Sequence, residues 1–406
     1  MKFAYIANAR IPTEKAHGLQ IMRMLEAFSK SGYPVCHSKI GGVRAAKKTF
    51  EENILKNKIK AELIIPKRLN KIKTEINEYY GVKPIFKIKR LPCLDLSGLG
   101  LDGVKIGFFI QSFTFAASAA VYIFFKKFDI VYSRGRFSLL PFIFSRKKLF
   151  FEAHNIPSIF FIYKILFKRM DGIIAITENI KNTLSRKGIS VFKIIVAPDG
   201  VDFKKFDISI SKNEARKKIN LPVDKKIILY SGHLYPWKGA AVLLSSARNF
   251  LDEFLFVFVG GTDKDIKDFK EKAEKDKLRN VFFAGHKPHN EIPLWLKAAD
   301  VLVLPNSAKE KISAFYTSPL KMFEYMAAKR PIITSNLPSI REVLDNSNSV
   351  LAEADDPDSF SDAIKKVLQD EELSVKISDN AYHAAKNYTW EIRARRIINF
   401  VMRDRA

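Results

Sequence analysis

One acidic residue, Glu324, stands on an otherwise apolar predicted helix within the segment Ser313–Ser335. The helix follows a Ser-Pro turn at Ser318 and runs into a β-branched strand. Burying a carboxylate costs on the order of several kcal/mol unless hydrogen-bond donors satisfy it. We therefore expect Glu324 to bind a ligand, and a pair of sugar hydroxyls would supply suitable donors.

A second polar group occupies the loop Ser231–Gly239, which follows a predicted strand beginning at Lys226 and precedes a predicted helix. Ligands of open α/β sheets bind at the carboxyl ends of the strands, and a helix start offers amide donors to phosphate. Lys238 adds a full positive charge there, and His233 adds a further donor. A solvated lysine and an ordinary loop histidine are the structural alternatives, but together with Glu324 the pattern predicts a phosphate-containing ligand.

Two further loops follow predicted strands in the first half of the chain. In Phe151–Pro157, Glu152, His154 and Asn155 stand at a strand end, and we expect them to point into a cleft. In 7–20, Gly18 permits close backbone approach to a ligand. The polar residues of that loop form a candidate substrate lip with no assigned order: Arg10, Glu14, Lys15 and His17.

Short apolar strands alternate with helices along the chain, which is typical of doubly wound parallel sheets. The first predicted series of strands is Phe3–Ala7, Glu62–Ile65, Asp129–Tyr132, Leu149–Glu152, Gly172–Ile176 and Lys193–Ala197. The second series begins at Lys226 and continues with Phe254–Val259, Val281–Ala284, Val301–Leu304 and Ile332–Thr334. Two such series predict two Rossmann-like domains that join near Pro198–Phe203.

The net charge of +26 predicts an anionic partner, which is nucleic acid, a membrane surface or a phosphorylated substrate. From Lys39 to Arg90 there are 15 Lys or Arg against 5 Glu, although a solvated face explains such a cluster equally well. The two cysteines, Cys36 and Cys93, match no metal or redox spacing and suggest a reducing compartment. We expect no signal peptide, because the chain opens on an apolar strand.

Two apolar segments bear on membrane contact. Ile106–Phe125 has no charged residue and is long enough to span a bilayer. We expect a helix packed inside an α/β domain, with monotopic insertion as the alternative and a true span as the least favoured. Ile159–Arg169 mixes aromatic and basic residues, which suits either an anionic membrane surface or a helix with one core face. Gly98–Gly103 fits G-x-G-x-x-G but lacks its strand and helix context, so we interpret it as a turn.

These residues together resemble the retaining GT-B glycosyltransferases of family 4, and the resemblance covers nearly the whole chain. It is most specific in Ser231–Gly239, Asn280–Pro305 and Ser313–Val343. The tail from Asn387 resembles the family's last helix, which crosses back to the first domain. The resemblance implies an α/β GT-B fold with two Rossmann-like domains facing across a cleft: 1–200, 201–385 and a returning helix in 386–406.

The resemblance also implies roles for individual residues. Glu324 would bind the donor ribose, Lys238 the diphosphate, and His154 would lie near the transferred sugar. Gly18 would approach the diphosphate, and Lys287 would lie near the base. The turn at the start of the helix would present backbone amides to sugar and phosphates: Ser318, Pro319, Leu320 and Lys321.

The chain departs from the family pattern at two positions. The first glutamate of the family's Glu-x7-Glu motif is Tyr316 here, and an arginine common in the family is replaced by His233. These changes leave the donor sugar and the grip on the diphosphate undefined.

The predicted function is metal-independent, same-face transfer of a sugar from a nucleotide-diphosphate sugar, without a cofactor. The acceptor would be a lipid-linked saccharide, a glycolipid or a surface-polymer precursor, and the protein would be cytoplasmic and peripheral to an anionic membrane. A GT-B nucleotide-sugar epimerase is the alternative, distinguished by conversion of donor alone. A nucleic-acid binder is a remote alternative suggested only by charge. Base, donor sugar, linkage and oligomeric state stay open.

Overall fold

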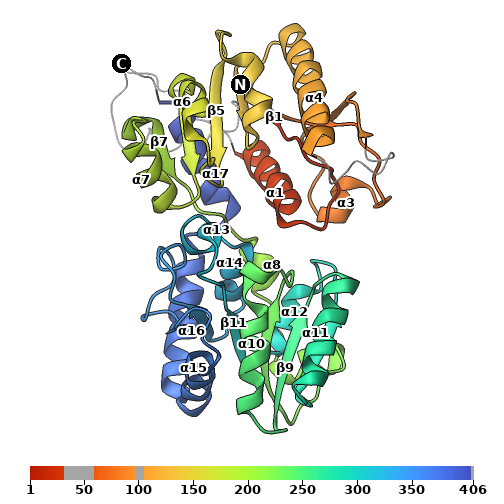
Figure 1. Cartoon of the computed structure of the whole chain (residues 1–406), viewed down its shortest axis with the longest axis vertical. Coiled ribbons are helices and arrows are strands. Elements are labelled where there is room, and N and C mark those ends of the chain that lie inside the picture. Colours follow the sequence, from red (N-terminus) through yellow and green to blue (C-terminus); the bar gives the residue numbers. More distant parts are fainter. Residues whose placement is uncertain (32–58, 97–104, 404–406) are drawn as a thin grey trace, which may run out of the picture. The chain divides into compact units, whose positions relative to one another are not determined.

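The computed structural model describes residues 1–31, 59–96 and 105–403, which form two compact units (Figure 1). Unit 1 comprises residues 1–176, 180–197 and 390–406, and unit 2 comprises residues 177–179 and 198–389. The unit boundaries at 197 and 389 fall within a few residues of the predicted 200 and 385. Cys36, the motif Gly98–Gly103 and part of the basic segment from Lys39 lie outside the described residues.

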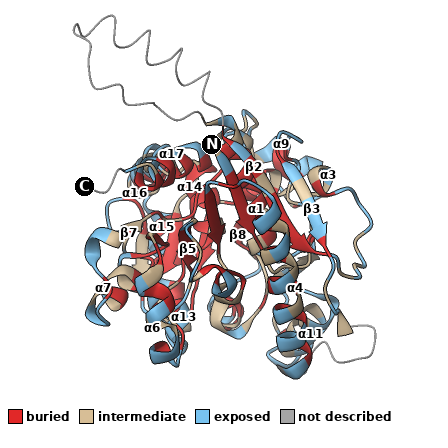
Figure 2. Cartoon of the chain, turned by 90° about the horizontal axis from the view of Figure 1, so that it is seen from above, coloured by how far each residue is buried: buried red, intermediate tan, exposed pale blue. Residues whose placement is uncertain are grey.

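Unit 1 is built on a seven-stranded sheet in the order β3-β2-β1-β4-β5-β6-β7, and its neighbouring strands pair in parallel. The strands are β1 (Lys2–Ile6), β2 (Lys60–Pro66), β3 (Lys87–Leu91), β4 (Ile130–Ser133), β5 (Lys148–Ala153), β6 (Gly172–Ala175) and β7 (Ile194–Val196). The five inner strands are mostly buried, which explains their continuous apolar sequences, whereas the edge strands β3 and β7 are less buried (Figure 2).

Helices cover this sheet, and one of them comes from the end of the chain. They are α1 (Ala16–Lys30), α3 (Ile76–Tyr80), α4 (Lys105–Phe125), α5 (Arg136–Leu139), α6 (Phe160–Arg169), α7 (Glu178–Arg186) and α17 (Trp390–Val401). Figure 1 shows α17 in blue among the elements of unit 1. Its Phe400 ring packs so close to Gly172 that a Cβ there would lie 2.4 Å from the ring. The tail helix therefore completes the core of unit 1.

Unit 2 is built on a six-stranded sheet in the order β10-β9-β8-β11-β12-β13, with parallel pairing throughout. The strands are β8 (Lys226–Ser231), β9 (Phe254–Val259), β10 (Val281–Gly285), β11 (Val301–Leu304), β12 (Ile332–Ser335) and β13 (Val350–Ala352). Alternate residues of β8 enter two separate cores: Ile227 and Leu229 enter one, and Ile228 and Tyr230 the other. The sheet is thus covered on both faces, as the sequence predicted.

The helices of unit 2 are mostly short. They are α8 (Phe203–Phe206), α9 (Lys212–Lys218), α10 (Ala240–Ser246), α11 (Asp263–Lys275), α12 (Ile292–Ala298), α13 (Lys311–Phe315), α14 (Leu320–Ala327), α15 (Pro357–Gln369) and α16 (Glu371–Ala385). Helix α14 is buried on every side, because all its residues from Lys321 to Ala327 are buried. Its charged members, Lys321 and Glu324, therefore stand in the interior of the unit.

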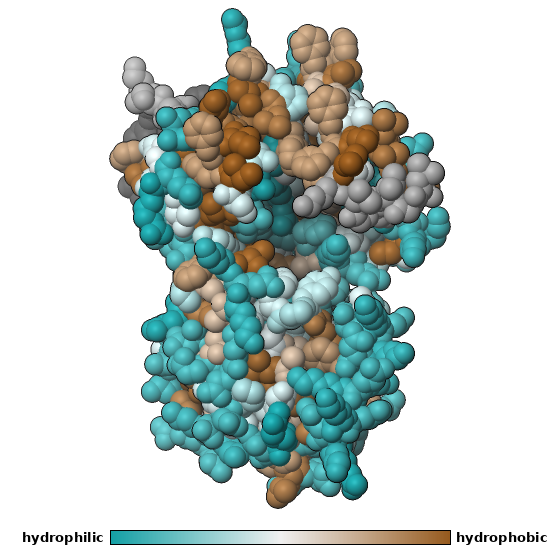
Figure 3. Space-filling model, viewed as in Figure 1, coloured by the Kyte–Doolittle hydropathy of each residue, from teal (hydrophilic) through white to brown (hydrophobic). Residues whose placement is uncertain are grey.

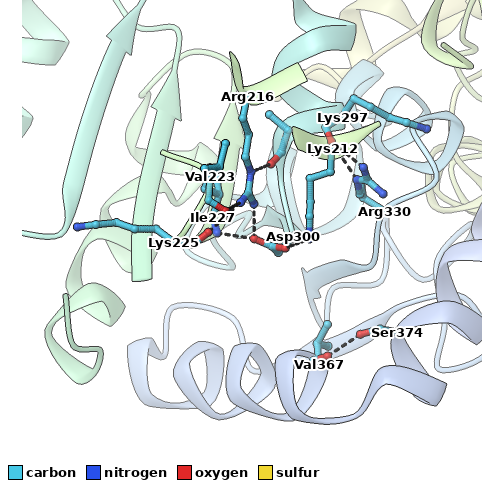
Figure 4. Close-up of polar contacts among 11 residues, drawn as sticks. Lys212, Arg216, Val223, Lys225, Ile227, Lys297, Asp300, Arg330, Val367 and Ser374 are labelled. Atoms are coloured by element: carbon cyan, nitrogen blue, oxygen red, sulfur yellow. Dashed lines mark hydrogen bonds and ion pairs between the residues drawn. The ribbon is translucent and has the colours of Figure 1, made fainter. Parts of the chain in front are cut away.

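A saturated ion-pair network anchors the amino ends of β8 and β11 (Figure 4). Asp300, directly before β11, accepts from Lys212 Nζ and Arg216 Nη2 at 2.5 Å each, and from the amide of Ile227 at 2.7 Å. Arg216 also donates to three backbone carbonyls, those of Ala298, Val223 and Lys225. Burial alone would raise the pKa of Asp300, but these donors outweigh it and lower that pKa.

Candidate active site

The path of the loop after β8 depends on two glycines that no other residue type could replace. Gly239 has φ +70°, and a Cβ there would lie 1.6 Å from the carbonyl oxygen of Pro305. Gly232 has φ +128°, and its own carbonyl oxygen would lie 2.5 Å from a Cβ on Gly260. Both positions require positive φ and close backbone approach, so the loop is held in one path.

Lys238 ends the 3-10 turn η5 (Pro236–Lys238) in this loop. Its Nζ lies over the Trp237 ring, 4.0 Å from the centroid. Desolvation lowers the pKa of Lys238 to about 8. A cation held in this way gains from an anion, because the anion restores the stabilisation that water no longer provides. The predicted phosphate-binding role of Lys238 stays a prediction that this environment favours.

His233 lies in the same loop, stacked on Tyr235 with ring centroids 4.9 Å apart and planes inclined by 6°. The backbone carbonyl of His233 accepts a hydrogen bond of 2.6 Å from the Tyr230 hydroxyl. These two contacts fix the position of His233 within the loop that also carries Lys238.

Glu324 is 8% exposed and meets a partner that sequence reasoning missed. Nε2 of His289 lies 2.8 Å from Oε1 of Glu324, and Nδ1 of His289 lies 3.1 Å from Nζ of Lys205. His289 follows β10, on the loop that also carries Lys287. In the sequence, the only sign that His289 belongs to a site is its position after the end of a strand. Its contact with Glu324 depends on the order of the strands in the sheet, which the sequence does not state.

Lys321 lies one turn before Glu324 and is 7% exposed. Its Nζ is 3.7 Å from the centroid of the Tyr230 ring. Desolvation and the charge of Lys238 lower the pKa of Lys321 well below its ordinary value, although Glu324 opposes them. Because Lys321 feels both Lys238 and Glu324, the three residues form one charged cluster at the carboxyl end of β8.

The other predicted donor-side residues lie around this cluster. Ser318 Oγ accepts from the amide of Asp199 at 3.0 Å, so this hydroxyl fixes the chain before β8. Pro319 has no N–H, so the predicted amides of the turn are those of Ser318, Leu320 and Lys321. Tyr316 is half-buried, with its ring 6.3 Å from that of Phe315, and Lys287 Nζ lies 5.4 Å from the centroid of Trp295.

In unit 1, Glu152 is a buried anchor rather than a cleft residue, so the prediction that it points into a cleft is wrong. It is fully buried, accepts hydrogen bonds from Gln20 Nε2 at 2.5 Å and from the Tyr132 hydroxyl, and forms an ion pair of 3.2 Å with Arg393 Nη2. Burial would raise the pKa of Glu152, but Arg393 and His154 outweigh it and hold that pKa well below its usual range.

His154 owes its orientation to this anchor. Nε2 of His154 lies 2.6 Å from Oε1 of Glu152, while the histidine side chain stays 22% exposed. His17 lies close enough to His154 to feel its charge, and burial, Arg134, Lys15 and His154 lower the pKa of His17 to about 4. The structure therefore brings His17 and His154 together, with His17 neutral at pH 7.

The remaining predicted residues of unit 1 are more dispersed. Arg10 is half-buried, Glu14 and Lys15 are exposed, and Asn155 Oδ1 accepts from Arg136 Nη1 at 2.9 Å. Packing alone explains why a glycine stands at position 18, because a Cβ there would lie 2.2 Å from the Tyr80 hydroxyl. Its predicted approach to a diphosphate stays a prediction.

Two doubly wound parallel sheets, with charged residues after the strand ends, define the GT-B class of fold. The structure matches that of Anabaena HepE in complex with UDP and glucose over 98% of both chains, with a TM-score of 0.73 at 13% sequence identity. At this identity the match establishes the fold alone. The GT-B fold predicted from the sequence is confirmed.

Within this class, residues 211–384 match the family model described as "Glycosyl transferases group 1". The match lies within unit 2, so this unit is similar to the group 1 glycosyltransferases, as the sequence predicted.

Two relatives are a D-inositol 3-phosphate glycosyltransferase of Xylanimonas cellulosilytica and a UDP-Gal:alpha-D-GlcNAc-diphosphoundecaprenol alpha-1,3-galactosyltransferase of Escherichia coli. The first is 25% identical over 54% of this chain and 54% of its own length. The second is 29% identical over 46% of this chain and 48% of its own length. The similarity thus spans about half the length of these relatives.

Proposed function

We propose that the protein is a retaining glycosyltransferase that uses a nucleotide-diphosphate sugar and needs no metal. The observation that carries this proposal is the cluster of Lys238, Lys321 and Glu324 at the carboxyl end of β8. A carboxylate suits ribose hydroxyls and a cation suits a diphosphate, and both stand on one side of the sheet in a group 1 domain.

The charges of this cluster suit the reaction. As the bond between the sugar C1 and the phosphate oxygen breaks, negative charge grows on the diphosphate, and Lys238 stabilises it. A new bond forms between C1 and the acceptor oxygen on the same face, and the acceptor proton passes to a phosphate oxygen. A donor placed at growing charge is worth about 3 kcal/mol.

His154 serves the acceptor side in this proposal. Glu152 is locked by several donors and fully buried, so it orients His154 and does not attack the sugar. His154→Ala is expected to lower kcat by about 100-fold, which corresponds to the loss of one positioned polar group, and to leave donor affinity within twofold. Loss of donor affinity with normal kcat would contradict this placement.

The test of the donor assignment is a thermal-shift panel of nucleoside diphosphates and their sugars, because a ligand that binds only the folded state raises Tm. UDP and UDP-sugars come first, since UDP is the ligand of the similar Anabaena structure. Turnover with acceptor and EDTA supports metal-independent transfer. Conversion of donor alone into an epimer would favour the epimerase alternative, and no shift with any nucleotide would overturn the proposal.

We further propose a lipid-linked or glycolipid acceptor and peripheral attachment to a cytoplasmic membrane face. Helix α4 supports this part. Among the described residues, Ile106–Phe125 is the one helix whose length and composition would allow it to cross a membrane. Only 33% of its most apolar stretch is buried in the structure. The expectation of a core helix is wrong for its outer face, where Phe113 is 76% and Phe124 80% exposed.

Helix α4 is apolar on both faces: Phe115, Ala119 and Ile123 are buried in unit 1, and a second row of apolar residues is exposed. Exposed apolar residues recur every three or four positions and so share one face: Ile106, Phe109, Phe113, Ala117, Val121 and Phe124. The inner face carries Gln111 and Ser112, which form hydrogen bonds of 2.9 Å with Asn8. An exposed apolar stripe on a helix whose other face is packed in the unit suits insertion parallel to a lipid surface.

This apolar surface continues onto α5 and α6. Phe109 contacts Phe137 at 5.7 Å between ring centroids, and Phe137 contacts Tyr163 at 6.4 Å. Helix α6 then exposes Phe161 and Ile165 next to basic residues in the same helix. Figure 3 shows apolar atoms gathered over the part of unit 1 where Figure 1 labels α4 and α6. Basic and aromatic residues side by side suit anionic lipid headgroups.

The test is sedimentation with vesicles of three parts phosphatidylcholine and one part phosphatidylglycerol. Phe113→Glu and Phe161→Glu are expected to reduce vesicle binding by at least tenfold, because each places a charge in the apolar face. Leu251→Glu, at an exposed apolar residue of unit 2, is the matched control. Equal binding by all three variants would contradict this surface, and release by high salt would support its electrostatic part.

A further inference from the structure

Lys321 in unit 2 has a buried side-chain amine without a hydrogen-bond acceptor among the described residues. Nζ of Lys321 meets no hydrogen-bond acceptor within residues 1–31, 59–96 and 105–403, and the residue is 7% exposed. Placing a cation in such surroundings costs free energy. A buried charge that the fold leaves without an acceptor is most simply explained by a ligand.

The surroundings of Nζ show where such a ligand would lie. The Tyr230 ring covers one side, with its centroid 3.7 Å from Nζ. On another side, a Cβ built on Gly232 would lie 3.3 Å from Nζ, so the ammonium group reaches the loop after β8. This is the loop that carries Lys238. The side chain of Lys321 therefore extends from α14 to the predicted diphosphate position.

The charges that act on Lys321 come from two elements. Lys238 acts from the loop after β8, and Glu324 acts from α14 itself. Glu324 is already engaged by His289 at 2.8 Å. Desolvation lowers the pKa of both lysines, and the charge of Lys238 lowers that of Lys321 further. Two neighbouring desolvated amines are both stabilised in their charged forms by an anion that carries two or more negative charges.

We propose that Lys321 Nζ is the second cation of the diphosphate site, beside Lys238, and that binding of the diphosphate is accompanied by uptake of a proton. This inference rests on the proposed function, because it requires a nucleoside diphosphate as ligand. Without a ligand, burial disfavours the charged forms of both amines. The bound anion favours the ammonium forms, so a proton enters from solvent with the ligand and leaves with the product.

The experiment uses the full chain and isothermal titration calorimetry. The probe is whichever of UDP, GDP, ADP, CDP and dTDP binds the wild type most tightly, with its nucleoside as the uncharged control. Titrations at pH 8.0 in HEPES and in Tris give the number of protons taken up, because these buffers differ in ionisation enthalpy. The variants are Lys321→Met and Lys321→Arg, and Lys329→Met is the matched control on an exposed lysine beyond the same helix.

The wild type is expected to take up protons with the diphosphate. Lys321→Met should bind the diphosphate about 10- to 100-fold more weakly, the range for one lost hydrogen bond to a charged group, with unchanged affinity for the nucleoside. Lys321→Arg should keep most of the affinity and take up fewer protons, because arginine stays charged. Lys329→Met should match the wild type.

Each other outcome is decisive. Wild-type affinity and proton uptake in Lys321→Met would overturn the inference and leave the proposed function intact. Equal losses for diphosphate and nucleoside would show a structural role only, and would also overturn it. Failure of the wild type to bind any of the five diphosphates would overturn the proposed function itself.

Discussion

The two ends of the unit 2 sheet treat buried charge in opposite ways. At the amino end, Asp300 and Arg216 satisfy each other and the backbone carbonyls around them. At the carboxyl end, Lys321 has no acceptor within the described part of the chain, and Lys238 rests on an aromatic ring. The comparison separates charges that stabilise the fold from charges that we propose bind a ligand.

The largest effect is expected from a substitution that breaks the ion-pair network at the amino end of the sheet. Asp300→Ala leaves Arg216 buried without its carboxylate, so the free energy of unfolding should fall by about 3–5 kcal/mol. Urea unfolding measures it. Asp379→Ala is the control, since it removes an exposed pair with Lys329 and should cost under about 1 kcal/mol. Equal losses in the two variants would remove the distinction between the ends.

The next effect belongs to the carboxyl end. Glu324→Ala should weaken donor binding by about 3–4 kcal/mol, because two hydrogen bonds to a carboxylate are lost, while stability changes little. Calorimetric titration with the donor and urea unfolding give the two quantities. Glu324→Gln keeps one acceptor oxygen and should fall between. A stability loss without an affinity loss would place Glu324 with Asp300 as a folding residue.

A smaller effect concerns pH. With its pKa at about 8, Lys238 is mostly charged at pH 7 and mostly neutral at pH 9. Diphosphate affinity should therefore fall by about tenfold, or about 1.4 kcal/mol, between these values. In Lys238→Arg the charge at this position persists, so the decline should become smaller, and what remains belongs to Lys321. An affinity that rises toward pH 9 in the wild type would contradict the assignment of Lys238.

The smallest effect has the opposite sign from the first. The folded-state pKa of Lys321 is lowered, so its charged form costs stability at neutral pH, and this cost fades as pH rises toward the unfolded value. Lys321→Met should raise the free energy of unfolding by about 1 kcal/mol at pH 7 without ligand, and by less at pH 10. Destabilisation by this substitution would mean that the fold depends on Lys321 after all.

The strands inside both sheets could be predicted from their apolar sequences, whereas two edge strands were missed. β3, Lys87–Leu91, alternates basic and apolar residues, and β13 has three residues. A strand at the edge of a sheet is less buried than an inner strand, so it needs fewer apolar residues. The predicted helix Phe137–Phe144 is a short α5 followed by a 3-10 turn at Leu140–Phe142.

The candidate site was predictable where a residue's place in a motif carried the information. Lys238 and Glu324 were found in that way. His289 and the network of Glu152 were not, because their partners come from distant segments that only the strand order brings together. The outward face of α4 was missed because an apolar sequence does not state which side of a helix is covered.

The contact between His289 and Glu324 bears on how long a product stays bound. One oxygen of the acid already has a partner before any nucleotide arrives, so ribose hydroxyls exchange that partner instead of meeting a bare carboxylate. Exchange of one hydrogen bond for another gains little net free energy. The contact with His289 thus holds the acid in one orientation, and under the proposed function it would keep the acid from binding the spent nucleotide too tightly.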